Sequence, residues 1–366
     1  MDPLFSAYGW TDDEFGFVWM TESSGASPDG TSSTRALADD LPRWAALLTP
    51  TALRSPGTKD NAAAGGGGAV FCSFATPNLS FWRLLALPDG RTKARPLPVY
   101  DRKMPLDKSK SYVLIETNEG DTPRIVVSAF SKSWTDPRRG SMPISWAIDP
   151  QLGEEFPALF DYFSSTAGVN DSFISGPGGC GYVYYGRMTD PQIKSFATRC
   201  GRLMKDYGPA VIDTFGQQGP SEAHSVSVLS NFSKYAAAGG VAPQMYITQP
   251  TGNIKYSYYQ CDESNIDTWQ PDGTPVLCTH SGVFYVMGSM GGEKLASHIN
   301  AIAANHSKPY FITVYGGLRW TTTTGMTKNT SLYSFWGDTI ANLDPGIEAV
   351  GAQEMARLAR EAHGLQ

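Results

Sequence analysis

Three carboxylates fall within six residues of the chain, in the segment Glu116-Thr117-Asn118-Glu119-Gly120-Asp121. This acidic loop follows an apolar stretch of strand length, residues 111–115, and precedes a helical pattern that starts near Pro123. Carboxylates held close together acquire different pKa values, so one can act as an acid and another as a base, and a hard cation can also relieve their repulsion. The acidic loop is therefore a candidate for catalysis. The alternative is a solvated loop that caps the following helix.

A second candidate is the glycine-rich loop Gly176-Pro177-Gly178-Gly179-Cys180-Gly181, together with Tyr182 and Tyr184. The loop formally matches the dinucleotide fingerprint GxGxxG. That fingerprint must open a helix facing the pyrophosphate, whereas the next helical pattern here begins only at Pro191, so nucleotide binding is not expected. Glycines let a backbone approach a ligand closely, and tyrosines offer flat faces with hydroxyl tips, which suits a sugar. Packing of the two tyrosines in an irregular connection remains the alternative.

Four other side chains could join a sugar site. Asp13 and Glu14 lie beside aromatic residues in Tyr8-Gly9-Trp10-Thr11-Asp12-Asp13-Glu14, a pattern that exposed helix starts share. His280 follows one apolar run of strand length and Trp320 lies beyond another. In a parallel barrel both would line the mouth at the carboxyl ends of the strands, although residues at such positions are more often structural.

Several other chemistries have no supporting pattern. The five histidines form no HxH, HxxxH or HExxH motif, and the five cysteines show no zinc spacing. There is no GxSxG elbow of a serine hydrolase. The sequence therefore predicts no metal site and no cofactor, and leaves carboxylate chemistry or binding.

Composition restricts the partners. With a formal net charge of -6 and dispersed Lys and Arg, the 366-residue chain has no basic stripe for a nucleic acid. No apolar stretch approaches the roughly 18 residues of a membrane helix, and the first twenty residues lack the basic start and apolar run of an export signal. Neither the odd number of cysteines nor any other feature predicts the redox compartment or the oligomeric state.

The elements that must position these residues alternate along the chain. Apolar runs too uniform for half-exposed strands alternate with segments of helical spacing, which predicts a parallel sheet covered by helices. At this length a distorted (β/α) barrel, similar to a TIM barrel, fits best, with an open doubly wound sheet as the alternative. Asp149, at the end of one run, is expected to cap the helix that Pro150 introduces. The runs are residues 69–74, 112–116, 144–148, 210–213, 244–248, 275–278, 310–315 and 347–350, and the helical segments are 123–134, 153–166, 191–207, 221–237, 292–305, 333–342 and 352–362.

Composition also suggests how the chain is divided. Residues 57–68 are rich in glycine and alanine and predict a flexible loop. It would separate an N-terminal segment, residues 1–56, which packs on the barrel, from the barrel-like domain at 69–366. Within that domain, an alternating stretch followed by a turn signal predicts a β-hairpin insertion near residues 253–285.

Taken in order, several motifs resemble the GxGYxYP family of "putative glycoside hydrolases", specifically its C-terminal domain, over most of the chain. Gly179-Cys180-Gly181-Tyr182-Val183-Tyr184-Tyr185 is similar to the signature, and residues 8–14 are similar to the family's GWGxDE segment. Residues 142–150 resemble its Pro-x-x-Trp-x-Ile-x-Pro strand, and residues 118–122 resemble its Ser-Asp-Gly-Asp-Asn loop. The resemblance implies that Glu119 and Asp121 belong to the site and that the protein is extracellular.

The sequence departs from the family pattern at three positions of these motifs. Tyr185 replaces the closing proline of the signature, Glu119 replaces an aspartate and Thr122 replaces an asparagine. A one-carbon-longer acid shifts its carboxylate by roughly 1 to 1.5 Å, and a shift of this size can cost about a hundredfold in rate. Binding can therefore survive where activity does not.

Three functions remain open. The first is a carbohydrate-active hydrolase in which Glu119 and Asp121 act as an acid–base pair across a glycosidic bond, while Tyr182 and Tyr184 form a sugar platform. The second is a glycan-binding or structural protein on the same fold without catalysis. The third is a metal-assisted deacylase, which needs a divalent ion near the two carboxylates.

Overall fold

The computed structural model describes the chain in segments between residues 84 and 364. They are residues 84–99, 104–117, 126, 130–176, 178–180, 190–209, 211–214, 217–218, 222–236, 240–243, 246–247, 274–275, 277, 291–316 and 332–364. The predicted N-terminal segment, the glycine-rich loop at 57–68 and almost all of the predicted hairpin insertion lie outside these residues.

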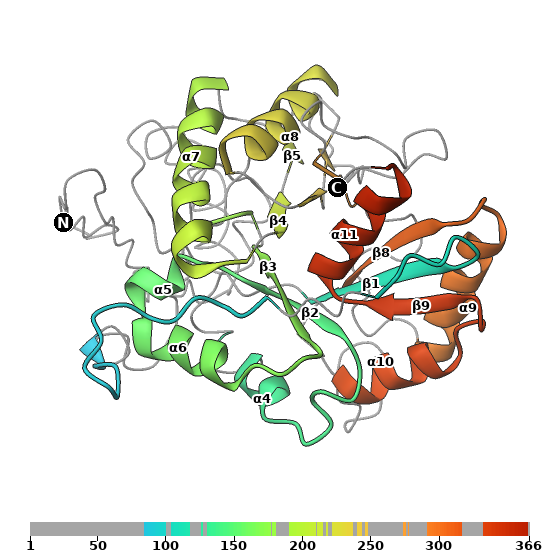
Figure 1. Ribbon diagram of the computed structural model, residues 1–366, viewed down its shortest axis with the longest axis horizontal. Coiled ribbons are helices and arrows are strands. Elements are labelled where there is room, and N and C mark those ends of the chain that lie inside the picture. Colours follow the sequence, from blue (N-terminus) through green and yellow to red (C-terminus); the bar gives the residue numbers. More distant parts are fainter. Residues whose placement is uncertain are drawn as a thin grey trace, which may run out of the picture.

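A parallel sheet forms the centre of the molecule (Figure 1). Its strands follow the order β6-β4-β3-β2-β1-β8, with β9 also paired to β1, and every pairing is parallel. A separate pair joins β5 (Gln217–Gln218) and β7 (Tyr246–Ile247). The strands of the main sheet are β1 (Ser111–Thr117), β2 (Ile144–Ile148), β3 (Asp171–Ser175), β4 (Val211–Thr214), β6 (Gly240–Pro243), β8 (Tyr310–Gly316) and β9 (Ile347–Val350).

Helices follow most of these strands where the apolar spacing predicts them. One predicted helix, residues 153–166, is two helices instead, because Pro157 has no backbone N–H to continue the first and begins the second. In the described part of the predicted helix at 123–134, Val126 and Phe130 are π-helical and a short α-helix follows at Ser131–Trp134. The helices are α4 (Ser131–Trp134), α5 (Leu152–Glu155), α6 (Pro157–Thr166), α7 (Asp190–Tyr207), α8 (Glu222–Ala236), α9 (Gly292–Ala304), α10 (Leu332–Ala341) and α11 (Ala352–Ala362).

Both faces of the sheet are buried, which explains the uniformly apolar strands. Side chains of a strand alternate between faces. Val113 and Ile115 of β1 belong to the large core formed with α4 and α6 to α10, whereas Tyr112 and Leu114 belong to a smaller core formed with α11. We call these the outer and the inner face.

Helix α11 fills the inner face. The backbone N–H of Ala352, at its start, donates to Ser145 Oγ (3.0 Å) and Ser172 Oγ (2.9 Å) of the sheet. Further along, buried Glu354 accepts a hydrogen bond from the backbone N–H of Met104 (2.9 Å), ahead of β1. The helix therefore closes the interior on the side of the amino ends of the strands and leaves the carboxyl ends as the possible mouth.

The sheet is a curled half-barrel, so the prediction of a complete barrel goes further than the structure. Among the described residues β6 and β8, at the two ends of the sheet, do not pair with each other. The sheet stays open because β1 has two partners besides β8. Residues 111–114 of β1 pair with β9, and residues 116–117 pair with β2. Helix α11 follows β9 into the interior and buries the apolar surface that further strands would cover in a closed barrel.

Two predicted strands also differ. In the run at 275–278, Pro275 and Leu277 are not in a strand. The described residues of the predicted strand at 244–248 form β7, which pairs with β5, and the strand that joins the main sheet is β6, which lies just before it. Its sequence, Gly240-Val241-Ala242-Pro243, is too short and too rich in glycine and proline to stand out as a strand pattern.

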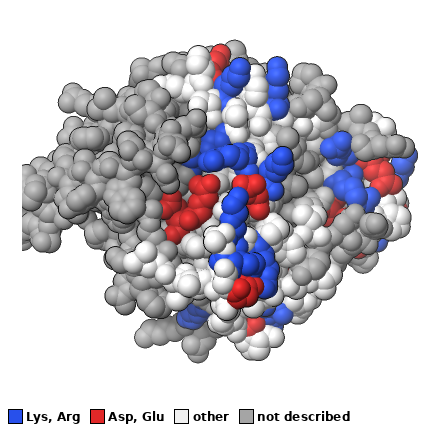
Figure 2. Space-filling view, turned by 60° about the vertical axis from the view of Figure 1, so that its left-hand side comes forward, with Lys and Arg blue, Asp and Glu red and all other residues white. Residues whose placement is uncertain are grey.

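Residues 84–99 are bound to α6 by hydrogen bonds. Arg91 and the backbone N–H of Arg95 both donate to Asp161 on α6, at 2.9 Å each. Burial alone would raise the pKa of Asp161, but these bonds outweigh it and the pKa is lowered. Figure 2 shows acidic and basic side chains interspersed on the face that it presents. Arg202 of α7 and Glu154 of α5 form an ion pair at 3.6 Å. Of the helices described, none combines the length and apolar character needed to cross a bilayer.

Candidate active site at the carboxyl ends of the strands

All eight residues that the sequence predicts for the site lie outside the described part of the chain. The structure therefore neither brings them together nor separates them. They are Glu119, Asp121, Tyr182, Tyr184, Asp13, Glu14, His280 and Trp320. The described residues do include the strands that lead directly into the acidic loop and into the signature loop.

Three fully buried acids stand at the carboxyl ends of the sheet. Glu116 lies near the end of β1, Asp149 directly after β2 and Asp213 near the end of β4, and each has a relative exposure of 0%. Alternation along the strands assigns Glu116 and Asp213 to the inner face, with Leu114 and Val211. Buried carboxylates on the open side of a parallel sheet are the pattern of a site at the strand ends.

Strand register places two of these acids at one level. Ile148 pairs with Ser175, and Ser175 pairs with Ile212. The next residue on each strand is Asp149, Gly176 and Asp213, so a glycine stands between the two aspartates. Because neighbouring strands are about 4.8 Å apart, the Cα atoms of the aspartates are separated by roughly 10 Å.

Gly176 makes room for the carboxylate of Asp213. A Cβ atom at Gly176 would lie 2.6 Å from Asp213 Cβ and 2.8 Å from Asp213 Oδ2. Distances this short do not occur between real side chains, so any other residue would displace the acid. The side chain of Asp213 therefore leans over the strand that separates it from Asp149.

Asp149 is oriented by its own turn. Its Oδ1 accepts a hydrogen bond from the backbone N–H of Gln151 (2.8 Å), and its carbonyl accepts one from Leu152 (3.0 Å) at the start of α5. Asp149 therefore closes the turn ahead of α5 and is not its cap, contrary to the sequence prediction: the N-cap of α5 is Gln151, without a side-chain cap hydrogen bond. The complete burial of Asp149 goes beyond this role, because acids at helix starts are usually exposed to water.

Glu116 belongs to a different level. Its register neighbour on β2 is Ser145, four residues before Asp149, and Ser145 Oγ accepts from the first N–H of α11. A carboxylate near a helix N-terminus is stabilised by the helix dipole, which favours a structural role for Glu116. Across the described residues, no three His, Cys, Asp or Glu side chains group closely enough to hold a metal ion.

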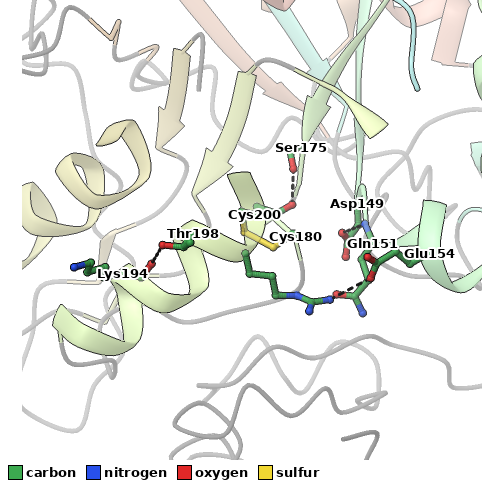
Figure 3. The surroundings of a disulfide bond; sticks show 10 residues. Asp149, Gln151, Glu154, Ser175, Cys180, Lys194, Thr198 and Cys200 are labelled. Atoms are coloured by element: carbon green, nitrogen blue, oxygen red, sulfur yellow. Dashed lines mark hydrogen bonds and ion pairs between the residues drawn. A yellow bond between two sulfur atoms is a disulfide. The ribbon is translucent and has the colours of Figure 1, made fainter. Parts of the chain in front are cut away.

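The start of the signature loop is held in a fixed turn. Gly178 and Gly179 have φ values of 82° and 83°, in the left-handed region that favours glycine. Ser175 Oγ donates to the Gly179 carbonyl (2.8 Å), and Cys180 forms a disulfide with Cys200 of α7. Figure 3 shows this disulfide between the loop and α7, with Asp149, Gln151 and Glu154 nearby.

Sequence reasoning missed Asp213 and the disulfide. Asp213 ends an apolar run, like Asp149, so a rule that collects every acid at a strand end would have found it. Cys180 and Cys200 show no pairing motif, and their contact depends on how α7 packs beside β3. The sequence suggests that Gly176 lets the backbone approach a ligand closely, whereas in the structure it makes room for Asp213 of the next strand.

Comparison with known proteins agrees with this architecture. Residues 109–360 match the family described as "GxGYxYP putative glycoside hydrolase C-terminal domain". A comparison with curated proteins found no match. A solved structure titled as a "putative hydrolase" from Bacteroides thetaiotaomicron is similar to 88% of this chain, with a TM-score of 0.66 and 16% identity. The matched region spans 60% of that longer protein.

Two further structures are more distantly similar. An allantoinase shows a TM-score of 0.42 at 11% identity, over 74% of this chain and 99% of its own. A "putative polysaccharide deacetylase" from Mycobacterium smegmatis shows a TM-score of 0.38 at 10% identity, over 75% of this chain and 96% of its own.

Proposed function

Because this chain belongs to the GxGYxYP family, we propose that it is a carbohydrate-active hydrolase that works at the carboxyl ends of its curled sheet. The observation that carries the proposal is the pair of fully buried aspartates, Asp149 and Asp213, at one level on either side of Gly176. Glycosidic bonds are cleaved by two carboxyl groups placed on opposite sides of the scissile bond.

The spacing of the pair supports this chemistry. Hydrolases that retain configuration hold their two carboxyl groups about 5 Å apart, and those that invert it hold them roughly 6.5 to 9.5 Å apart. Side chains that project from strands with Cα atoms roughly 10 Å apart on a curled inner face fall in this combined range. Because Gly176 has no side chain, the carboxylate of Asp213 can lie over the strand between the two acids, which shortens the gap between their carboxyl groups.

The surroundings of the two aspartates suggest their roles. The backbone N–H of Gln151 donates to Asp149 Oδ1, and a hydrogen bond to a carboxylate stabilises its charged form. We assign Asp149 as the base or nucleophile. Asp213 leans over Gly176 between strands and is assigned as the acid that protonates the leaving oxygen.

The residues named by the sequence complete this proposal. In the sequence, Glu119 and Asp121 follow Thr117, the last residue of β1, by two and four residues. They are proposed as further acids at the mouth, and Tyr182 and Tyr184, which follow the fixed turn after β3, as the sugar platform. Asp13, Glu14, His280 and Trp320 are proposed as further substrate contacts.

The experiment is a glycan panel tested with wild type, Asp149→Asn and Asp213→Asn. Each variant is expected to lower kcat by about 100- to 10,000-fold while KM changes little, because general acid–base catalysis contributes on this scale. An aryl glycoside with a good leaving group needs no protonation. Asp213→Asn should therefore keep most of its rate on that substrate and Asp149→Asn should not. Asp338→Asn, on the exposed side of α10, is the matched control.

The outcomes separate this function from its alternatives. Turnover by both variants at the wild-type rate would remove the aspartate pair from the mechanism, and the same test with Glu119→Gln and Asp121→Asn would then examine the acidic loop. Binding of a glycan by wild type without turnover would indicate a binding protein on a hydrolase fold. Activity that depends on an added divalent ion, and is lost with chelator, would indicate the metal-assisted deacylase.

A further inference from the structure

Two consecutive residues of α7, Cys200 and Arg199, contact the turn that follows Gly176 and the helix that follows Asp149. Cys200 is bonded to Cys180, four residues after Gly176. Arg199 Nη2 lies 3.6 Å from Glu154 Oε2 on α5, the helix that begins directly after the Asp149 turn. Figure 3 shows the disulfide of Cys200 with Cys180, and Glu154 near it.

The connection between the disulfide and Asp213 is short and stiff. Ser175 Oγ closes the turn by donating to the Gly179 carbonyl (2.8 Å). A Cβ atom at Gly179 would meet Ile212 Cδ1 at 3.2 Å and Cys200 Sγ at 3.4 Å, so the turn packs directly on β4 and on the disulfide. Movement of Cys180 is therefore transmitted to Gly176, against which the carboxylate of Asp213 rests.

Helix α7 packs closely against α5 and α8, so it can hold the disulfide in a fixed position. A Cβ atom at Gly153 of α5 would lie 2.5 Å from the ring of Tyr207, and one at Gly201 would lie 2.5 Å from the carbonyl of Tyr235 on α8. Cys180 and Cys200 are both fully buried. A disulfide so placed is shielded from small reductants in the folded protein and acts as a permanent tether.

We propose that Arg199 and the Cys180–Cys200 disulfide form a clamp that positions Asp149 and Asp213, and that the chain acquires this clamp in an oxidising compartment. The inference rests on the proposed function of the aspartate pair. Formation of the bond takes two protons and two electrons from the two thiols, and an external disulfide accepts them and becomes a dithiol. Compartments that maintain such disulfide donors are the ones in which protein disulfides persist.

The test compares wild type with the double variant Cys180→Ser/Cys200→Ser. Peptide mapping of wild type, alkylated without reductant, should find residues 180 and 200 in one linked species. In the double variant, hydrogen exchange should become faster in the peptide covering residues 172–180 and remain unchanged in α9. We expect kcat on the glycan substrate to fall at least about tenfold with little change in KM, because misplacement by 1 Å costs up to about a hundredfold.

The pH profile distinguishes positioning from a loss of folded protein. A smaller folded fraction lowers the rate at every pH equally, whereas displacement of Asp213 also moves the limbs of the kcat profile. Leu295→Ala in α9 is the destabilised control, because it opens a cavity remote from the clamp and should leave the profile in place. Arg199→Gln is expected to speed exchange in α5 and leave residues 172–180 unchanged.

Two results would overturn the clamp. One is recovery of Cys180 and Cys200 as free thiols from wild type purified without reductant. The other is a double variant with wild-type exchange, kcat and pH profile. If wild type instead turns over no glycan, the proposed function fails, while mapping and exchange still decide whether the clamp holds the turn.

Discussion

At the scale of single residues, the site depends on a missing side chain as much as on its acids. Asp213 reaches toward Asp149 because Gly176 has no Cβ where the carboxylate lies. Packing against Asp213 thus requires a glycine at position 176, directly after β3, whether or not a ligand is bound.

Gly176→Ala tests this packing. The new Cβ would lie 2.6 Å from Asp213 Cβ, so we expect the carboxylate to be displaced and kcat to fall by about a hundredfold. Gly291→Ala is the matched control, because no atom lies within 4 Å of its new Cβ. Thermal unfolding gives a second measurement: the loss of stability should be smaller when Asp213→Gly is also present. Equal losses in both backgrounds would contradict the contact.

At the scale of elements, α7, the helix that follows β3, packs against α5 and α6, the two helices that follow β2. Its Tyr207 ring packs against Gly153 of α5 and at 5.6 Å from the ring of Phe160 on α6. Burial, assisted by the nearby charge of Glu154, raises the pKa of Tyr207 to about 12. The packing of α7 therefore requires the phenol of Tyr207 to stay un-ionised.

Alkaline unfolding should reveal this tyrosine. Between pH about 10 and about 12 the unfolded chain releases the Tyr207 proton while the folded protein retains it, so folded stability falls as pH rises through this window. The contribution is fully present below pH about 10 and amounts to about 1.4 kcal/mol for each pH unit of the shift. Tyr207→Phe keeps the ring and should reduce the fall in urea-unfolding free energy between pH 9 and 11.

The control for this measurement is Tyr162→Phe, at a tyrosine that is 42% exposed. That variant should follow the wild-type pH dependence. An identical alkaline slope for wild type and Tyr207→Phe would show that the phenol is solvated in the folded protein.

At the scale of the whole molecule, α11 fills the inside of the curled sheet. It covers Tyr112 and Leu114 of β1, Ile174 of β3 and Val211 of β4. Because the amino side is filled, the carboxyl ends are where a substrate can approach the inner face. The fold thus selects the side on which the aspartate pair stands.

Deletion of residues 346–366 should prevent stable folding, since it removes β9 and α11 and uncovers the inner apolar face. We expect binding of a hydrophobic dye and loss of a cooperative thermal transition, measured by fluorescence and circular dichroism. Deletion of residues 365–366 alone, beyond α11, should leave the transition in place. A cooperative transition in the longer deletion would show that α11 is dispensable.

Much of the fold was predictable because it is encoded locally. Strands buried on both faces have uniformly apolar sequences, as in Ile144 to Ile148, and helix starts carry signals such as Asp190-Pro191. These features need no knowledge of distant residues. Parallel pairing of the strands follows from their alternation with helices, and the family followed from several motifs in order.

The site was less predictable because it depends on contacts between segments far apart in the chain. Nothing near Asp149 or Asp213 shows that the two acids stand at one level, since strand register is determined by packing across the whole sheet. The same holds for Cys180 with Cys200 and for α11 inside the curl. Residue types therefore indicated carboxylate chemistry, but only packing across the sheet decided which buried carboxylates stand at one level.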